Sequence, residues 1–232
     1  MTGLYSQHLE NKKKAYFRNF LLALVLIFLA LVTLFPIFYM IMSSFGPAVA
    51  TAGDNRSIFP QRWTLDSYRA FFNFSPYSLK WILNSFIVAG SVVLGNVIFA
   101  SMAGYAFSKI NFKGSKWLFA LMLVAMMIPY QVTQVPLYIL IANKLKMTNT
   151  YAAMILPGIV TSYNIFLAKQ FFQSIPTPLI DSAKLDGCTQ MGIFVRIVLP
   201  LSKTVLAVMA INTFMSSWNT FFWPFLVTSK EA

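Results

Sequence analysis

The sequence predicts an all-α membrane protein, a polytopic bundle of transmembrane helices, from three observations. Hydrophobic residues make up 58% of the 232 residues and charged residues only 10%, whereas soluble domains average about 45–50% and about 25%. Several uncharged stretches exceed the roughly 20 residues that a helix needs to cross a bilayer. The basic residues lie mainly in the gaps between these stretches, as in the loops of membrane proteins.

The formal net charge of +12 also suggests a nucleic-acid-binding protein. The placement of the basic residues favours membrane topology instead, and no nucleic-acid partner. His8 is the only histidine and Cys188 the only cysteine. The sequence therefore predicts no intrachain disulfide, no metal site and no cofactor.

The first span is predicted over about residues 20–42, after a basic N-terminal tail of residues 1–19. The sequence Ala48-Val49-Ala50 resembles a signal-peptide cleavage site, but the apolar core of a signal peptide has only about 7–15 residues. We therefore expect a retained anchor, with residues 20–232 forming one transmembrane domain.

A polar segment follows over residues 43–79, in which Leu65–Phe74 is expected to form a short amphipathic helix at the membrane interface. The second span is predicted over about residues 81–107, which carry no charge. It contains two pairs of small residues four positions apart, a spacing that lets another helix pack closely. The pairs are Ser91 with Gly95 and Ala100 with Gly104.

Three more spans are predicted over about residues 117–141, 151–172 and 201–227. The first two of these contain prolines, which remove backbone hydrogen bonds and bend helices. Those prolines are Pro129, Pro136 and Pro157. Such breaks are tolerated at membrane depth where they face protein or a water-filled cavity, so we expect both spans to be broken.

The distribution of positive charge predicts a multi-pass protein of the cell membrane with a cytoplasmic N-terminus. With the tail inside, the inner segments hold eleven of the 18 Lys and Arg residues. Four of the other seven lie in the long first outer segment, and long loops contribute less to the charge bias. Residues 173–200 then form a cytoplasmic loop.

This loop contains the most informative stretch of the chain, Asp181–Gly187. Three of its seven residues are charged, and charge so close to a membrane segment must lie in water or against a partner. Pro178 suits the first position of a helix. Asp186-Gly187 suits a helix end, since glycine adopts left-handed geometry readily. A solvated loop with a glycine cap is one interpretation; docking with another protein is the one we favour.

The spacing of this stretch resembles the EAA loop of ABC-importer permeases. The family pattern is Glu-Ala-Ala, three residues, Gly, nine residues, Ile, one residue, Leu-Pro. Here the matching residues are Asp181-Ser182-Ala183, Gly187, Ile197 and Leu199-Pro200. Asp181 replaces glutamate and Ser182 replaces alanine, from which we expect weaker or re-angled docking.

Other motifs are similar to the carbohydrate branch of these permeases, the maltose-permease type. They are Gly104-Tyr105-Ala106-Phe107-Ser108-Lys109, Pro136-Leu137-Tyr138, Asn164-Ile165-Phe166-Leu167, Trp218-Asn219 and Trp223-Pro224. The resemblance covers nearly the whole chain from about Phe20 and implies the type I ABC-importer permease fold. That family has six spans where this sequence shows five. We expect that the chain is truncated before the sixth, which would leave one side of the bundle open.

The resemblance implies a transport subunit, and no enzyme, that forms half of the translocation pathway for a sugar or oligosaccharide. It also implies partners: an ABC ATPase dimer, a second homologous permease subunit, an extracellular solute-binding protein and the surrounding lipid. Consistent with a separate ATPase, the chain lacks a Gly-x-x-x-x-Gly-Lys phosphate loop.

The resemblance assigns coupling with the ATPase to the loop that ends at Pro200. Asp181–Leu185 would form the coupling helix, with Asp181 in its first turn, where a negative charge favours the helix dipole. Ala183 would allow a close fit and Leu185 would offer an apolar knob. The full set of expected coupling residues is Asp181, Ser182, Ala183, Leu185, Asp186, Gly187, Leu199 and Pro200.

Polar and aromatic residues of the last two spans are the candidates for the substrate pathway, since amides and hydroxyls bind sugar hydroxyls and aromatic rings stack on sugar faces. They are Asn164, Asn212, Ser216, Trp218 and Asn219, with Ser217 and Trp223 in the same spans and Tyr130 in the span 117–141. The alternative is that the polar groups only join helix to helix and the aromatic rings anchor the protein at the membrane surface.

Two other functions stay open. A permease for another solute, such as a phosphorylated polyol, would favour a basic residue in the pathway, and none of the candidates is basic. A truncated chain would be a non-transporting membrane subunit. An intramembrane enzyme is disfavoured, because the five predicted spans contain no Asp, Glu or His.

Overall fold

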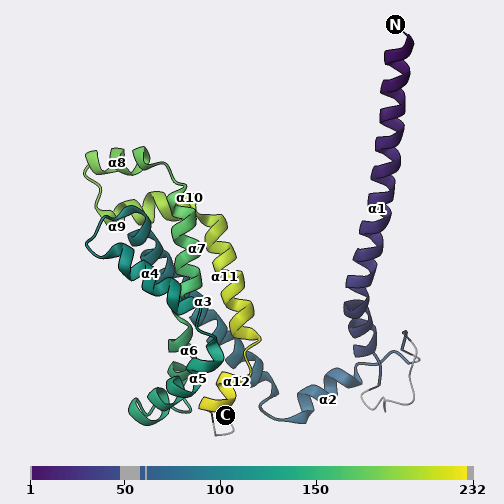
Figure 1. Cartoon of the computed structure of the whole chain (residues 1–232). Helices are drawn as coiled ribbons and strands as arrows, with labels where there is room; N and C mark the ends of the chain where they lie inside the picture. Colours follow the sequence, from purple (N-terminus) through teal and green to yellow (C-terminus); the bar gives the residue numbers. More distant parts are fainter. Residues whose placement is uncertain (1, 48–57, 61, 229–232) are drawn as a thin grey trace. The chain divides into compact units, whose positions relative to one another are not determined.

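The computed structural model describes residues 2–47, 58–60 and 62–228, with side chains described from Ala15 onward. All regular secondary structure in these ranges is helical, as the sequence predicts. The chain divides into two compact units, Met1–Leu79 and Lys80–Ala232, shown in Figure 1. The motif Ala48-Val49-Ala50 lies outside the described residues.

The described part of the first unit contains α1 (Thr2–Ser44) and α2 (Asp66–Phe74). The predicted span 20–42 lies inside α1, whose apolar part, Ala15–Ser44, has none of its most apolar window buried within the protein. The sequence predicts a helix over Leu65–Phe74, and in the structure this helix, α2, begins one residue later, at Asp66. It is bound to the end of α1 by a 2.8 Å hydrogen bond between the hydroxyls of Ser44 and Tyr68.

The second unit is built around three helices, α3, α7 and α11, with shorter helices at both ends. In chain order its elements are α3 (Ser78–Lys109), α4 (Ser115–Met126), α5 (Tyr130–Ile139), η1 (Leu140–Lys144), α6 (Tyr151–Ile155), η2 (Leu156–Gly158), α7 (Ser162–Gln173), α8 (Thr177–Leu185), α9 (Gln190–Ile193), η3 (Phe194–Val198), α10 (Leu199–Leu201), α11 (Lys203–Trp218) and α12 (Phe222–Val227). Figure 1 shows α8 and α9 at one end of this unit and α5, α6 and α12 at the other.

Among the described residues, two helices, α1 and α3, are long and apolar enough to cross a membrane alone. Three bent pairs bring the number to as many as five if each pair is one span: α4 with α5 and η1 (100°), α6 and η2 with α7 (41°), and α9 to α10 with α11 (82°). The first two bends occur at the predicted breaks. Pro129 precedes α5 as its N-terminal cap, and Pro157 lies in the short 3₁₀ turn η2.

The predicted last span, residues 201–227, contains two helices in the structure. α11 ends at Trp218 and α12 starts at Phe222. Two side chains explain the break: Asn219 Nδ2 donates to the Met215 carbonyl at 2.8 Å, and Thr220 Oγ1 donates to the Ser216 carbonyl at 2.6 Å. Side chains that bond the preceding turn in this way compete with continued helix.

α3 and α7 approach each other closely at Gly104, within the unit's core. Ala100 and Ala168 are fully buried in one apolar cluster. A Cβ added at Gly104 would lie 2.6 Å from Cβ of Ala168, so only glycine permits this approach. The predicted packing role of the Ala100 and Gly104 pair is therefore confirmed.

Candidate functional sites

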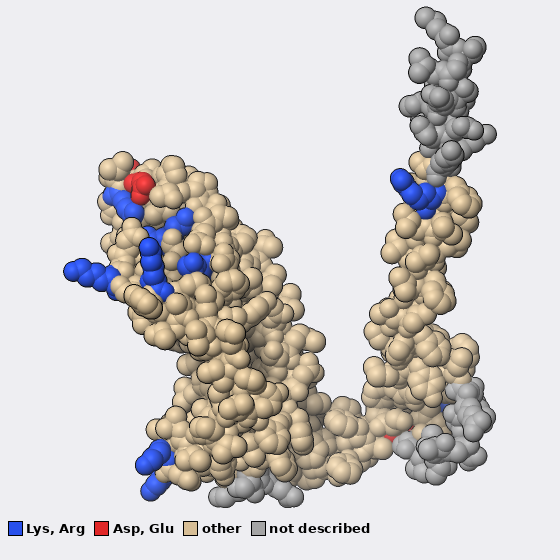
Figure 2. All heavy atoms as spheres, viewed as in Figure 1, with Lys and Arg blue, Asp and Glu red and all other residues tan. Residues whose placement is uncertain are grey.

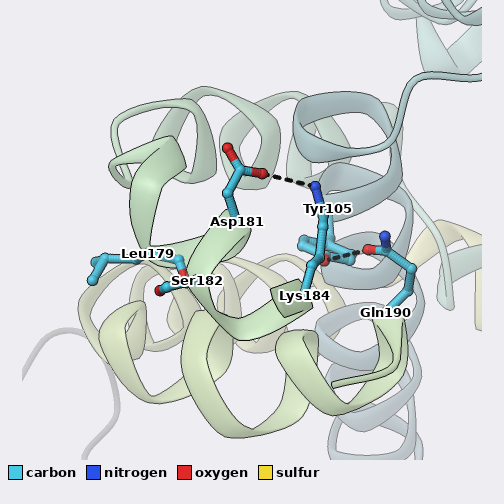
Figure 3. Close-up of polar contacts among 6 residues, drawn as sticks. All are labelled: Tyr105, Leu179, Asp181, Ser182, Lys184 and Gln190. Atoms are coloured by element: carbon cyan, nitrogen blue, oxygen red, sulfur yellow. Dashed lines mark hydrogen bonds and ion pairs between the residues drawn. The ribbon is translucent and has the colours of Figure 1, made fainter. Parts of the chain in front are cut away.

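The helix α8 forms the exposed part of the predicted coupling loop. It starts at Thr177, four residues before Asp181, with Pro178 in its first turn, where proline is favoured. The prediction that Asp181 opens the helix is therefore wrong, because the proline starts it earlier. Asp181 lies in the second turn instead, where its Oδ1 accepts a 3.0 Å bond from Lys184 Nζ, as Figure 3 shows.

The end of α8 is built as the sequence predicts. Gly187 has a φ of +79°, its N–H donates to the Lys184 carbonyl, and the N–H of Cys188 donates to the Ala183 carbonyl at 2.9 Å. This pair of bonds is the Schellman arrangement, which needs a left-handed residue where the helix stops. The turn therefore fixes the direction in which the chain returns to the membrane region.

The two faces of α8 differ in exposure. Ile180 and Ala183 are buried in the apolar core cluster, with Ala183 only 5% exposed. Leu185 is 89% exposed and Leu179 is also exposed. The structure thus places Ala183 against its own bundle, while Leu179 and Leu185 remain available to a partner. Ser182, Asp186 and Gly187 are exposed as well.

The last two predicted coupling residues, Leu199 and Pro200, lie in α10 beside the 82° bend that leads into α11. Leu199 packs against the same core cluster as Ala183, whereas Pro200 is exposed. They therefore sit where the chain turns back into the bundle.

A cavity of about 750 Å³ opens between the helices of the second unit. Asn164, Asn212 and Ser216 line it, together with the aromatic residues Tyr130, Tyr163 and Trp223. None of the described residues in its wall is charged. The wall combines apolar surface with amides and hydroxyls, a chemistry suited to a neutral polar solute.

The other two pathway candidates lie outside the wall of this cavity. The indole of Trp218 packs on the ring of Phe86, with 4.8 Å between centroids, and Asn219 bonds its own helix. The tryptophan in the wall is Trp223, which is buried and donates its Nε1–H to the Ala153 carbonyl at 3.0 Å. This bond holds the indole in place.

A buried amide that the sequence analysis did not single out joins the cavity wall to α3. Asn96 is 0% exposed; its Nδ2 donates to the Gly158 carbonyl at 3.0 Å and to Thr161 Oγ1 at 3.3 Å. Its Oδ1 accepts from Asn164 Nδ2 at 2.6 Å. An asparagine in the middle of an uncharged span is a signal for such a contact, and this signal points to Asn96.

This network fixes how the amide of Asn164 is turned. A carbonyl only accepts, so Asn96 must present its NH₂ to Gly158 and its oxygen to Asn164. Asn164 therefore donates, to Asn96 and also to Thr213 Oγ1 at 2.8 Å. Its own Oδ1 is left buried with no partner among the described residues. The cavity wall thus contains an unused hydrogen-bond acceptor.

No group of three or more His, Cys, Asp or Glu side chains comes together in the part of the chain that the structure describes. The described residues therefore offer hydrogen bonding and apolar contact around the cavity. They also present α8, with two exposed leucines, at one end of the unit.

Comparison with known proteins places these features in a family. Residues 96–232 match the family model described as binding-protein-dependent transport system inner membrane component. The chain is 36% identical over 219 residues to the arabinooligosaccharides transport system permease protein AraQ of Halalkalibacterium halodurans, covering 94% of this chain and 78% of that protein.

Two further similarities fit the same family. The sn-glycerol-3-phosphate transport system permease protein UgpE of Salmonella typhi is 37% identical over 155 residues, 67% of this chain and 54% of that one. The fold resembles that of a chain in a bacterial ABC transporter involved in the import of the acidic polysaccharide alginate. That match has a TM-score of 0.79 at 22% identity and covers 93% of this chain and 75% of the other.

The transport subunits in this family carry no ATPase, and ATP is hydrolysed by a separate subunit. The matched residues include α8, its glycine turn and most of the cavity wall. The chain therefore belongs to the family of binding-protein-dependent transport system inner membrane components, and it is a permease subunit of an ABC importer.

Proposed function

We propose that this permease forms half of a translocation pathway for a neutral sugar or oligosaccharide. The observation that carries the proposal is the uncharged cavity wall, in which Asn212, Ser216 and Asn164 offer amides and hydroxyls beside the rings of Tyr130 and Tyr163. Amide and hydroxyl groups bond to sugar hydroxyls, and aromatic rings cover the apolar faces of a sugar ring.

A phosphorylated polyol is the second candidate solute, since one relative carries the name of an sn-glycerol-3-phosphate permease. Phosphate is bound in proteins mainly by arginine and lysine side chains. The described cavity wall contains neither, which favours the neutral solute. The arabinooligosaccharide name of a relative agrees with this choice.

The proposal assigns coupling to α8. Its exposed leucines, Leu179 and Leu185, and the Asp181–Lys184 ion pair would dock into one subunit of an ATPase dimer. Closure of that dimer on ATP would then move α8 and switch the bundle between two states, in the manner of alternating access. A second permease subunit would supply the other half of the pathway, and an external binding protein would deliver the solute.

The proposed topology has α1, α3 and each of the three bent pairs crossing the membrane once. The N-terminus and α8 would both be cytoplasmic. Figure 2 shows most of the visible basic side chains of the second unit gathered toward the end that carries α8 and α9. An excess of Lys and Arg is expected on the cytoplasmic side.

The test is uptake by the complete importer, with both permeases, the ATPase and the binding protein reconstituted in liposomes. We expect accumulation of labelled arabino-oligosaccharide and none of glycerol 3-phosphate. Asn212→Leu should lower oligosaccharide uptake, whereas Asn73→Leu, a control on the exposed surface of α2, should not. Uptake of glycerol 3-phosphate in preference to the oligosaccharide would overturn the proposed substrate.

A further inference from the structure

Both ends of the segment that carries α8 are bonded to one helix, α3. Before α8, the carbonyl of Ile175 accepts a 2.6 Å hydrogen bond from Lys109 Nζ. After α8, Oε1 of Gln190, the first residue of α9, accepts a 2.9 Å bond from the Tyr105 hydroxyl. Figure 3 shows the second of these bonds beside α8. Residues 176–189 thus form a loop that contains α8 and whose two ends are both held against α3.

The two donors lie on the same side of α3. Tyr105 and Lys109 are four positions apart, which places their side chains one turn apart on one helix face. Their partners are fifteen residues apart in the sequence. Two successive turns of one rigid helix therefore fix the positions of the two ends of this loop relative to each other.

Partial burial strengthens these bonds. Tyr105 is 4% exposed, and its ring packs on that of Phe194 with 5.3 Å between centroids. Lys109 is half-buried and Ile175 buried. Hydrogen bonds shielded from water are stronger than exposed ones, and the bond from Lys109 is further strengthened by the positive charge of its donor.

The same helix reaches the cavity. Val88 and Val92 of α3 line it, and Asn96 binds the Gly158 carbonyl in its wall. Asn96 and Tyr105 are nine residues apart, about 14 Å along the helix axis. Because α3 is one unbroken helix from Ser78 to Lys109, a displacement at its Tyr105 end reaches the cavity wall without crossing a bend.

We propose that Tyr105 and Lys109 are positioning residues that hold the base of α8 to α3, so that motion of α8 is transmitted to the cavity along α3. The inference rests on the proposed docking of α8 with the ATPase. It goes beyond that docking because it assigns the route from the docked helix to the pathway, and it assigns it to two residues outside the coupling loop.

The test removes each donor and keeps the rest of the side chain. Tyr105→Phe keeps the ring on Phe194, and Lys109→Met keeps the apolar stem. A matched control for the first is Tyr151→Phe, which removes a hydroxyl that donates to Asn84 Oδ1 at 2.7 Å. Lys113→Met is the control for the second, since it removes a neighbouring positive charge. All four variants are assembled in the complete importer.

The decisive readout is solute transported per ATP hydrolysed, which a purely structural defect would leave unchanged in the complexes that do assemble. We expect this ratio to fall about fivefold or more in Tyr105→Phe and Lys109→Met, the range of typical coupling between sites. ATP hydrolysis should continue, and the two controls should keep the wild-type ratio.

The acceptor side gives a second, milder test, because Gln190 is exposed and its replacement does not disturb the core. Gln190→Leu should lower the ratio as Tyr105→Phe does, and Gln190→Glu, which keeps an acceptor oxygen, should restore it. The double variant Tyr105→Phe with Gln190→Leu should be no worse than either single one. A wild-type ratio in Gln190→Leu would overturn the role of Tyr105.

Docking is measured separately, by cross-linking Leu185→Cys to the ATPase in a Cys188→Ser background. A normal cross-link with a reduced transport ratio supports the inference. A normal cross-link with an unchanged ratio in both donor variants overturns it and leaves the proposed function intact. If no cross-link forms in the otherwise unchanged chain, the proposed docking is wrong and the inference falls with it.

Discussion

Asn96 Nδ2 lies 3.0 Å from the carbonyl oxygen of Gly158, a residue 62 positions further along the chain. Gly158 ends the 3₁₀ turn that contains Pro157, and its carbonyl has left the regular α-helical pattern. In a membrane interior such a group must find a partner within the protein. The bond therefore lets a broken helix exist beside the cavity.

We expect Asn96→Leu to destabilise the second unit. The substitution removes the bonds that Asn96 makes to the Gly158 carbonyl and to the Asn164 amide, at a cost of about 1–3 kcal/mol in the free energy of unfolding. Asn84→Leu is the matched control, because Asn84 lies on the same helix and its bond to Tyr151 is at the surface. Thermal unfolding in detergent compares the two, and equal stability would contradict the buried network.

Gly104→Ala should separate α3 from α7. The added Cβ would lie 2.6 Å from Cβ of Ala168 and 2.9 Å from the backbone nitrogen of Lys169, which overpacks the contact and costs about 1–3 kcal/mol. Gly90→Ala on the same helix meets nothing within 4 Å and should not destabilise the unit. Melting temperatures in detergent check the pair; a loss at Gly90 as large as at Gly104 would rule out steric contact as the cause.

Substitution of Gly187 should weaken coupling without unfolding the bundle. Gly187 has positive φ, so Gly187→Val and Gly187→Pro force the end of α8 into another geometry, while Gly187→Asn tolerates it. A Cβ there meets no atom within 4 Å, and the effect is therefore one of backbone conformation. In Gly187→Val and Gly187→Pro, ATP hydrolysis should continue while uptake falls. In Gly187→Asn, uptake per ATP hydrolysed should stay at the wild-type value.

Labelling of Cys188 tests the proposed topology. This thiol follows the glycine turn and is partly exposed, so a membrane-impermeant maleimide should reach it from the cytoplasmic side. The ATPase should protect it, because α8 would be covered. Labelling from the external side would show that the topology is the reverse of the proposed one. Labelling that the ATPase does not affect would show that α8 is not part of the docking surface.

The α8 region shows which parts of the fold a sequence can predict. The turn at Gly187 could be predicted from the glycine alone, and the structure shows the positive φ that glycine permits. Pro178 likewise marks the first turn of the helix. Whether Ala183 is buried in its own chain or faces a partner depends on the rest of the core, since a small apolar residue suits both environments equally. Only the packed bundle decides between them.

The cavity shows the opposite case, in which distant contacts decide. Trp218 and Trp223 are five residues apart, yet only Trp223 lies in the cavity wall. The break between α11 and α12 changes the direction of the chain between them, so helical periodicity does not relate the two indoles. In the same way, the role of Asn96 depends on Gly158 and Asn164, which lie in another part of the sequence.

The apolar part of α1, with nothing of its most apolar window buried inside the chain, has a consequence for how the protein tolerates mutation. Exchange of leucine for isoleucine, valine or phenylalanine there replaces no side chain that is buried among the described residues, and it therefore creates no void in a packed core. Saturation mutagenesis of this helix should act as a filter on polarity alone, with a charge at its centre costing about 2.5–3.5 kcal/mol of insertion free energy. In α3, by contrast, shape is selected as well, because Gly104 accepts no other side chain without displacement.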